Sequence, residues 1–337
     1  MSQKILALRF AAPVLGCLLA GTSPSLYAQS SHSNGAAGGW HQIESGMPPV
    51  MIHPTREASE QARASAPPTG QASTSNDLNY HGGVGGIGVE TTPLVYLVLW
   101  GSQWNNNDPS GESTILQNFY RGVGGSSWAN SVTQYCQGVA TGTVYCNGAG
   151  QAAGNPPSIF AGIWVDNSSS APSKPRQSQL AAEAVRAAAH FGNTTASRNS
   201  TVQYVIATSH GNSSTGFGTQ YCAWHSSTSS SYGNVAYTNL PYLTDAGASC
   251  GANFNGLGAK AGITIVGGHE MAETMTDQFP NGGWLDSGGA ENGDKCAWIS
   301  SGQGASANIT LSTGTFPVQT LWSNASNSGA GACVLAY

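Results

Sequence analysis

The sequence predicts an α+β fold, in which one domain carries a mixed sheet packed on helices and is cross-linked by disulfides. Three observations lead to this expectation. A continuous apolar run at 92–101 is typical of a buried strand. The alanine-rich segment 178–192, which ends at Gly192, is typical of a helix. Predicted strands and helices follow one another without a regular alternation, which favours one α+β core over a doubly wound sheet.

The first 28 residues have the features of a secretory signal peptide. Lys4 and Arg9 precede an apolar run, and small residues lead to an expected cleavage after Ala28. The run is too short and too weakly apolar for a membrane span, so we expect a secreted protein. Cys17 raises the alternative of a lipoprotein signal, but the apolar run continues beyond it.

Residues 29–78 are rich in Ser, Ala, Gly, Pro and Gln, with few apolar residues spaced for burial. This composition predicts a flexible leader or propeptide and places the folded domain at 79–337. Within the leader, "MPPVMIHP" (47–54) could pack on the domain as an inhibitory segment. The leader contains no cysteine, so no thiol of the leader can bind and mask a metal of the domain.

The remaining elements are expected from local patterns. Apolar residues at four-residue intervals in 112–123 predict a helix, and the β-branched run at 201–211 predicts a strand. A Gly/Ser/Asn-rich stretch follows, and then a second strong helix pattern at 261–278. Short strands are expected at 307–311 and 318–322.

Composition excludes several classes of function. Only 8% of residues are charged, against roughly 25% in an ordinary soluble protein, and there are 45 glycines. Such a surface is common in secreted proteins. The net charge of −5 and the scarcity of Lys and Arg leave no basic stripe for nucleic acid. The chain also lacks a phosphate-binding glycine motif with its lysine, which argues against a nucleotide role.

Six cysteines remain after the signal peptide, and an even number in an exported chain implies disulfides. Six cysteines allow 15 connectivities. We expect sequential pairing, because each pair then closes a loop of modest length. The six are Cys136, Cys146, Cys222, Cys250, Cys296 and Cys333.

Acidic residues gather in one part of this poorly charged chain. Of its 16 carboxylates, six fall within 25 positions, with only Lys295 as a cation among them. Burying unpaired carboxylates is costly, and a bound divalent ion would offset their repulsion. The six are Glu270, Glu273, Asp277, Asp286, Glu291 and Asp294.

The stretch "GGHEMAETMTDQ" (267–278) resembles an HExxH zinc motif with glutamate at the second ligand position. On a helix, His269 and Glu273 are four residues apart and project from the same face. Zinc accepts carboxylate oxygen as well as imidazole nitrogen, so this ligand change is chemically permissible. Glu270 would then lie beside the metal as the general base.

The third ligand should come from downstream, and Glu291 and Asp294 in "ENGDKCAW" are the expected candidates. His210 and His225 are alternatives for a ligand. His210 follows a predicted strand in "TSHG", where we favour a role in catalysis or substrate binding. Zinc is the expected ion, whereas the oxygen-rich loop with Asp286 leaves calcium open as a structural alternative.

Several motifs together resemble the phosphate-induced, EXORDIUM-like family of secreted plant proteins and their bacterial relatives. The motifs span roughly residues 80 to 335 in order. They are "YHGGVGG" and "TTPLVYLVLWGSQW" (80–104), "QYCAWHS" (220–226), "GGHEMAETMTD" (267–277), "GGWLD" (282–286) and "ENGDKCAW" (291–298). The resemblance implies an extracellular or cell-wall location and a zincin-like fold, but no defined activity.

The leading hypothesis is therefore a secreted zinc-dependent hydrolase, most simply a monomeric peptidase acting on an extracellular peptide or cell-wall substrate. The alternative from another class is a non-catalytic, wall-associated binding protein with a structural metal. A third is a glycan-active enzyme with Glu270 or Glu273 as acid and Glu291 as nucleophile or base.

Overall fold

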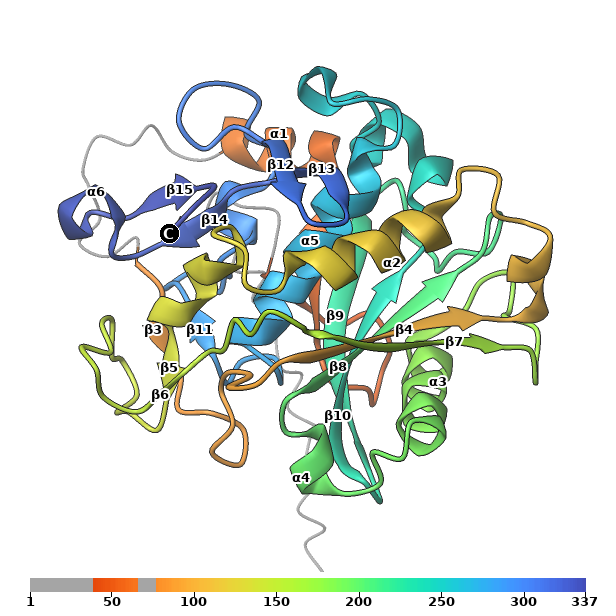
Figure 1. Ribbon diagram of the computed structural model, residues 1–337, viewed down its shortest axis with the longest axis horizontal. Helices are drawn as coiled ribbons and strands as arrows, with labels where there is room; N and C mark the ends of the chain where they lie inside the picture. The colour runs from red at the N-terminus through yellow and green to blue at the C-terminus, as the bar shows by residue number, and fades with distance from the viewer. Residues whose placement is uncertain (1–38, 66–76) are drawn as a thin grey trace, which may run out of the picture. The chain divides into compact units, whose positions relative to one another are not determined.

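The computed structural model describes residues 39–65 and 77–337, which form a mixed α+β structure around a seven-stranded sheet (Figure 1). The predicted α+β class is thereby confirmed. The strand order is β1-β2-β9-β10-β8-β4-β7. The strands are β1 (Gly39–His41), β2 (Val50–Pro54), β4 (Leu94–Trp100), β7 (Phe160–Asp166), β8 (Val202–Thr208), β9 (Tyr221–Ser230) and β10 (Gly233–Leu240).

Strand direction divides this sheet into two parts. Strands β10, β8, β4 and β7 are parallel, and β8 is buried along its whole length, as expected for an inner parallel strand. Strand β9 is antiparallel to β10, β2 is antiparallel to β9, and β1 is antiparallel to β2. The hairpin β9–β10 lies in the Gly/Ser/Asn-rich stretch, where no strand was predicted because its polar residues hide the strand pattern.

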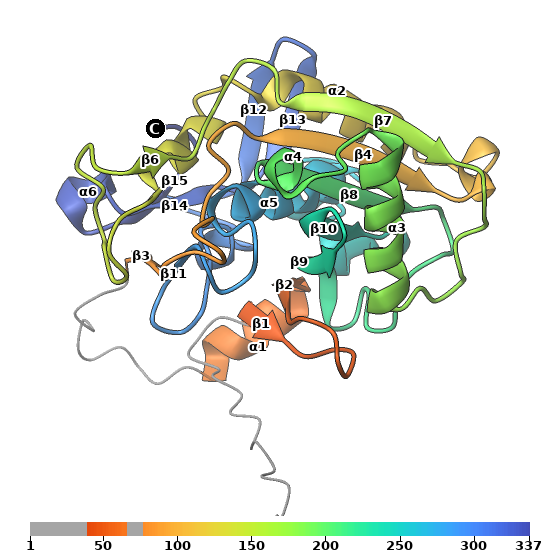
Figure 2. The same ribbon diagram turned by 90° about the horizontal axis from the view of Figure 1, so that it is seen from below.

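Helices cover both faces of the sheet (Figure 2). Helix α3 (Gln177–His190) packs on one face and supplies Leu180 and Ala184 to a core with Val98 and Ile206. The larger core on the other face joins the sheet to helix α2 (Glu112–Val123) and helix α5 (Ala261–Thr276). All three correspond to predicted helices within two residues at each end.

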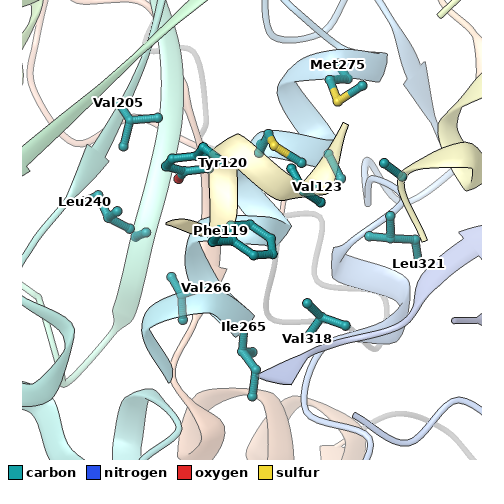
Figure 3. Packing of buried hydrophobic residues seen from close by; sticks show 14 of the residues in the cluster. Phe119, Tyr120, Val123, Val205, Leu240, Ile265, Val266, Met275, Val318 and Leu321 are labelled. Atoms are coloured by element: carbon teal, nitrogen blue, oxygen red, sulfur yellow. The ribbon is translucent and has the colours of Figure 1, made fainter. Parts of the chain in front are cut away.

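Two glycines let helices α2 and α5 approach closely. A Cβ on Gly267 would lie 3.1 Å from the Tyr120 hydroxyl, and one on Gly268 would lie 3.1 Å from Phe119. Figure 3 shows the aromatic rings of α2 beside α5. The "GG" that precedes the His–Glu motif therefore serves helix packing. Every residue of α5 is buried, so close packing on all sides holds this helix rigidly.

Smaller elements complete the described residues. The helices are α1 (Arg56–Ser65), α4 (Ala196–Asn199) and α6 (Ser326–Gly329), with short 3₁₀ turns at Ser102–Asn105, Ala129–Gln134, Leu243–Cys250, Phe254–Gly256 and Asp294–Cys296. Short antiparallel pairs join β3 (Asn79–Tyr80) to β11 (Trp284–Leu285), β5 (Cys136–Gln137) to β6 (Gln151–Ala152), β12 (Ala307–Leu311) to β13 (Gly314–Val318), and β14 (Leu321–Ser323) to β15 (Ala332–Val334).

The predicted strand at 307–311 is confirmed as β12, but the one at 318–322 is wrong. That segment is divided between β13 and β14, and Gln319 lies in the break. The break has a physical reason, because the Gln319 side chain turns inward and bonds to the main chain at Gly293 and Thr320.

Residues 39–65 of the leader are structured, contrary to the expectation of flexibility. They form β1, β2 and α1, and every residue of β2 is buried. The apolar residues of "VMI" face both sides of the sheet edge, so the segment lacks the spacing of an amphipathic element. Its status as a propeptide stays a prediction, and the signal peptide lies outside the described residues.

Sequential disulfide pairing is confirmed. The bonds are Cys136–Cys146, Cys222–Cys250 and Cys296–Cys333. Cys222 lies in β9 and Cys296 directly follows Lys295 in the acidic loop, so two of the three bonds tether segments with predicted site residues. Nowhere in residues 39–65 and 77–337 does a helix have the length and apolar character that crossing a membrane requires.

Candidate metal centre

Helix α5 presents the predicted His–Glu pair to the interior. His269 Nε2 lies 2.9 Å from Glu273 Oε1, which agrees with the predicted one-turn spacing on a single face. Glu270 is also buried, at 1% exposure. All three side chains come from a helix that is inaccessible along its length, so their positions are set by packing.

The acidic loop 291–296 returns to this helix. The main-chain N–H of Asp294 donates to Glu273 Oε1 at 2.9 Å, and Asp294 Oδ1 lies 3.8 Å from His269 Nε2. The amide of Asn292 donates to the carbonyl oxygen of Ala272 at 3.1 Å and anchors the loop on α5. The loop thus brings both predicted downstream residues, Glu291 and Asp294, to the site.

Strand β9 contributes His225, which the sequence suggested only as an alternative. Its Nε2 lies 2.9 Å from Glu291 Oε2 and 3.7 Å from Glu273 Oε2. Glu291 therefore contacts His225, whereas Asp294 lies near the His–Glu pair of α5.

A third histidine, His53, comes from the leader. Its ring stacks on that of His269 at a centroid distance of 3.8 Å and an interplanar angle of 12°, and it also stacks on Trp298. We call the resulting set the buried cluster. It consists of His53, His225, His269, Glu270, Glu273, Glu291 and Asp294.

Burial governs the protonation of this cluster. Desolvation raises the pKa of each of its four carboxyl groups well above the ordinary value, and their mutual repulsion adds to the rise. Desolvation also lowers the pKa of His269 to about 4 and that of His225 to about 3, so both imidazoles are neutral at pH 7. Neutral imidazole is the form that binds metals.

Many polar atoms of the cluster have no hydrogen-bond partner. Each such buried atom costs about 1–3 kcal/mol unless something compensates it. A divalent cation would satisfy these atoms and the carboxylate charge together. The unpartnered atoms are both carboxylate oxygens of Glu270, Oε2 of Glu273, Oε1 of Glu291, Oδ1 of Asp294, both ring nitrogens of His53, Nδ1 of His225 and Nε2 of His269.

The orientation of the His269 ring is fixed by a contact at Nδ1, the ring nitrogen that does not face Glu273. Gln319 donates its Nε2 to the Gly293 carbonyl oxygen at 2.8 Å, so its Oε1 faces His269 Nδ1 at 3.1 Å. His269 must then carry its proton on Nδ1, which leaves a lone pair on Nε2 toward Glu273 and Asp294. Metal-binding histidines are commonly oriented in this way.

The spacing of these ligand atoms fits a small cation. Tetrahedral ligands at about 2.1 Å from zinc lie about 3.4 Å apart. The two distances from His269 Nε2, 2.9 Å to Glu273 and 3.8 Å to Asp294, lie on either side of this value. Among the described residues, His269, Glu273 and Asp294 form one ligand group within 4.8 Å. Two further groups share Glu270, one with His53 and His269 and the other with His225 and Glu273.

Two residues from the sequence predictions lie apart from the cluster. His210 has a half-exposed side chain that pairs with Asp245 at 2.5 Å, so the structure does not bring it to His269, and its catalytic role stays a prediction. Asp286 accepts a hydrogen bond from Lys295 at 3.0 Å and orders its own loop through Gly288 and Ala290.

Sequence reasoning missed His53, Gln319 and Gly293. A Cβ on Gly293 would lie 2.6 Å from His269 Nδ1 and 2.8 Å from Glu273 Oε1, so only glycine permits this contact. The "ENGDKC" loop could have indicated a close approach through its glycine. For His53 the available signal was an apolar "VMIH" within a polar leader.

Comparison of the chain with protein-family models, with curated proteins and with solved structures gave no match. The resemblance to the phosphate-induced, EXORDIUM-like family is not tested by these comparisons and stays a prediction.

Proposed function

We propose that this chain is a secreted zinc-dependent hydrolase, and specifically a zincin-like metallopeptidase built on helix α5. One observation carries the proposal. His269 directs an unprotonated Nε2 toward two carboxylates, Glu273 and Asp294, and this nitrogen, Glu273 Oε2 and Asp294 Oδ1 all lack hydrogen-bond partners. A nitrogen ligand favours zinc over calcium, which takes oxygen ligands.

The roles of the residues follow from their contacts. His269, Glu273 and Asp294 would hold the ion. Asp294 is preferred to Glu291 as third ligand, because Glu291 Oε2 is 2.9 Å from His225 Nε2. His225 remains near enough to Glu273, at 3.7 Å, to approach a bound substrate or ligand.

Glu270 is the candidate general base. Neither of its oxygens has a hydrogen-bond partner, and it shares ligand groups with His269 on one side and Glu273 on the other. A bound zinc would polarise the substrate carbonyl and make a neighbouring water easier to deprotonate. Glu270 would accept that proton and deliver it to the leaving amine, for which its position one residue after a ligand is suitable.

The proposed location is extracellular. The three disulfides are typical of proteins in an oxidising compartment, and a signal peptide is expected from the sequence. The family resemblance adds the cell wall as a setting. We therefore propose an extracellular peptide or a cell-wall component as substrate, acted on by a monomer.

Elemental analysis with matched variants tests this proposal. The purified chain should contain about one zinc, and His269→Ala and Glu273→Ala should each lose it. Glu270→Gln should retain zinc but lose peptide hydrolysis. Glu112→Gln provides the control, because Glu112 is also a buried carboxylate but bonds to Thr244 and Leu243 away from the cluster. Hydrolysis by Glu270→Gln at the native rate would refute the assignment of the base.

A second candidate is supported by the burial of the site. His53, His225 and His269 are all 0% exposed, which is typical of a structural metal centre closed by protein ligands. A non-catalytic extracellular binding protein would carry such a site. In that case chelation should lower the melting temperature, and no peptide should be hydrolysed before or after removal of the leader.

A further inference from the structure

Strand β9 has its free edge covered by the leader of the same chain. Residues 50–54 run antiparallel to it, with Met51 opposite His225 and His53 opposite Ala223. Figure 2 shows β2 beside β9, with β1 beyond it. Without β2, the main-chain N–H and C=O groups of β9 would be unpaired on that side, and such an edge accepts an added strand.

Both ends of the leader strand are held through main-chain oxygens. The Ser226 hydroxyl donates to the Pro49 carbonyl oxygen at 2.7 Å, and the Trp298 indole N–H donates to that of Pro54 at 2.8 Å. Contacts of this kind do not depend on the side chains of the bound strand. Any extended peptide in the same register could accept them.

The side chains of the strand alternate between two surroundings. Val50 and Ile52 pack into the apolar core with Trp224 on the α3 side of the sheet. Met51 and His53 face the side of His225, where the buried cluster lies, because cross-strand neighbours share a face. The edge thus combines apolar positions with one position directed at the metal centre.

His53 is placed at that position. Its ring lies against His269, both its nitrogens are unpartnered, and it belongs to the same ligand group as His269 and Glu270. The His53 side chain therefore lies beside the proposed general base.

We propose that the edge of β9 is a binding site for an extended peptide with apolar side chains, and that residues 50–54 occupy it as an inhibitory strand with His53 on the metal. This inference rests on the proposed function and names its substrate class. A peptide substrate would pair with β9 in the direction of β2, with the bond to be cleaved beside Glu270. The register shifts between His53 and Pro54, so a bulge interrupts the regular pairing with β9 directly after this point.

The test uses the whole chain with a specific protease site introduced within 66–76. The chain is loaded with zinc, cut or left uncut, and equilibrated with excess labelled synthetic peptide of residues 39–65. The peptide should exchange into the cut chain and bind at least tenfold more weakly to the uncut chain, whose own segment is covalently retained. Equal binding to both forms, or binding to neither, would overturn the proposal.

Metal dependence tests the role of His53. Zinc should raise the affinity of the native peptide at least tenfold over the metal-free cut chain, and His53→Ala in the peptide should abolish this gain. His41→Ala is the matched control, because His41 is an exposed histidine of the same segment, and its peptide should keep the gain. A gain that survives His53→Ala would overturn the assignment of His53.

The binding experiment is independent of turnover, so the two proposals fail separately. Zinc-dependent exchange without hydrolysis of any apolar test peptide supports the occupied edge and refutes the peptidase. Equal hydrolysis by the cut and uncut chains, with no peptide exchange, refutes the inhibitory strand and leaves the peptidase standing.

Discussion

Gln319 holds His269 in one orientation through a contact of 3.1 Å between Gln319 Oε1 and His269 Nδ1. The same glutamine donates to the Gly293 carbonyl oxygen at 2.8 Å, beside Asp294. One buried side chain therefore links the helix that supplies two ligands to the loop that supplies the third. It comes from the break between β13 and β14.

Replacing Gln319 should weaken zinc binding without unfolding the protein. In Gln319→Met the proton on His269 Nδ1 loses its acceptor, so we expect a loss of about 10–100-fold in zinc affinity. Competition with a chelator measures it. Gln278→Met is the matched control, because Gln278 is equally buried and bonds to main-chain oxygens of Asn199 and Val202. An equal loss in both variants would point to general destabilisation.

Gly293→Ala should disturb the metal centre directly. The added Cβ would lie within 3 Å of both His269 Nδ1 and Glu273 Oε1, closer than side-chain carbons approach such atoms. We expect at least a tenfold loss of zinc affinity together with a lower melting temperature. Unchanged affinity would mean that the loop moves freely, which would argue against Asp294 as a fixed ligand.

Glu90 should make the free energy of unfolding decrease as pH rises. Burial raises its pKa to about 8 from 4.5, and only the hydrogen bond from Gln203 opposes this. Because the folded state holds the Glu90 proton more tightly than the unfolded state does, protonation stabilises the fold fully below pH 4.5. This stabilisation is lost as pH rises toward 8. Glu90→Gln should therefore raise the melting temperature at pH 8 and have little effect at pH 4.

The size of this effect is several kcal/mol at most, since one pKa unit corresponds to about 1.4 kcal/mol. Thermal unfolding of both proteins between pH 4 and pH 9 measures it. The exposed Glu57, changed to Gln, serves as control and should produce the same curve as the native chain. A Glu90→Gln difference that is constant with pH would contradict the proposed titration.

Zinc affinity should increase with pH. In the metal-free protein, burial and mutual repulsion raise the pKa of the cluster carboxyls, so at pH 6 protons compete with the ion. The imidazoles do not compete, because the pKa of His269 is about 4. Titration at pH 6, 7 and 8 should give progressively tighter binding with release of protons.

Removal of the ion should destabilise the fold. A ligand at a thousandfold excess over its dissociation constant contributes about 4 kcal/mol, which for a domain of this size corresponds to about 10 °C. A chelator should lower the melting temperature by this order, and zinc should restore it. Glu273→Gln should show no response to either.

Local signals identified the elements with the strongest patterns. Helices α2, α3 and α5 and strands β4, β8 and β12 lie where apolar or alanine-rich periodicity is clear. Strands β9 and β10 were missed because polar residues, mainly serine in β9 and asparagine and threonine in β10, interrupt their apolar pattern, and their burial comes from neighbouring strands. Strand β2 was missed because its partner, β9, is more than 160 residues away in the chain.

The sequence by itself was enough to predict the α+β class, the sequential disulfides, and the pairing of His269 with Glu273, because each depends on local periodicity or on short loops. Only the tertiary structure decided which distant residues complete the cluster. His53, His225 and Gln319 approach α5 from strand β2, strand β9 and a strand break, through sheet register and packing that no local pattern encodes. Long-range pairing therefore fixed the site, while short-range pattern fixed its central helix.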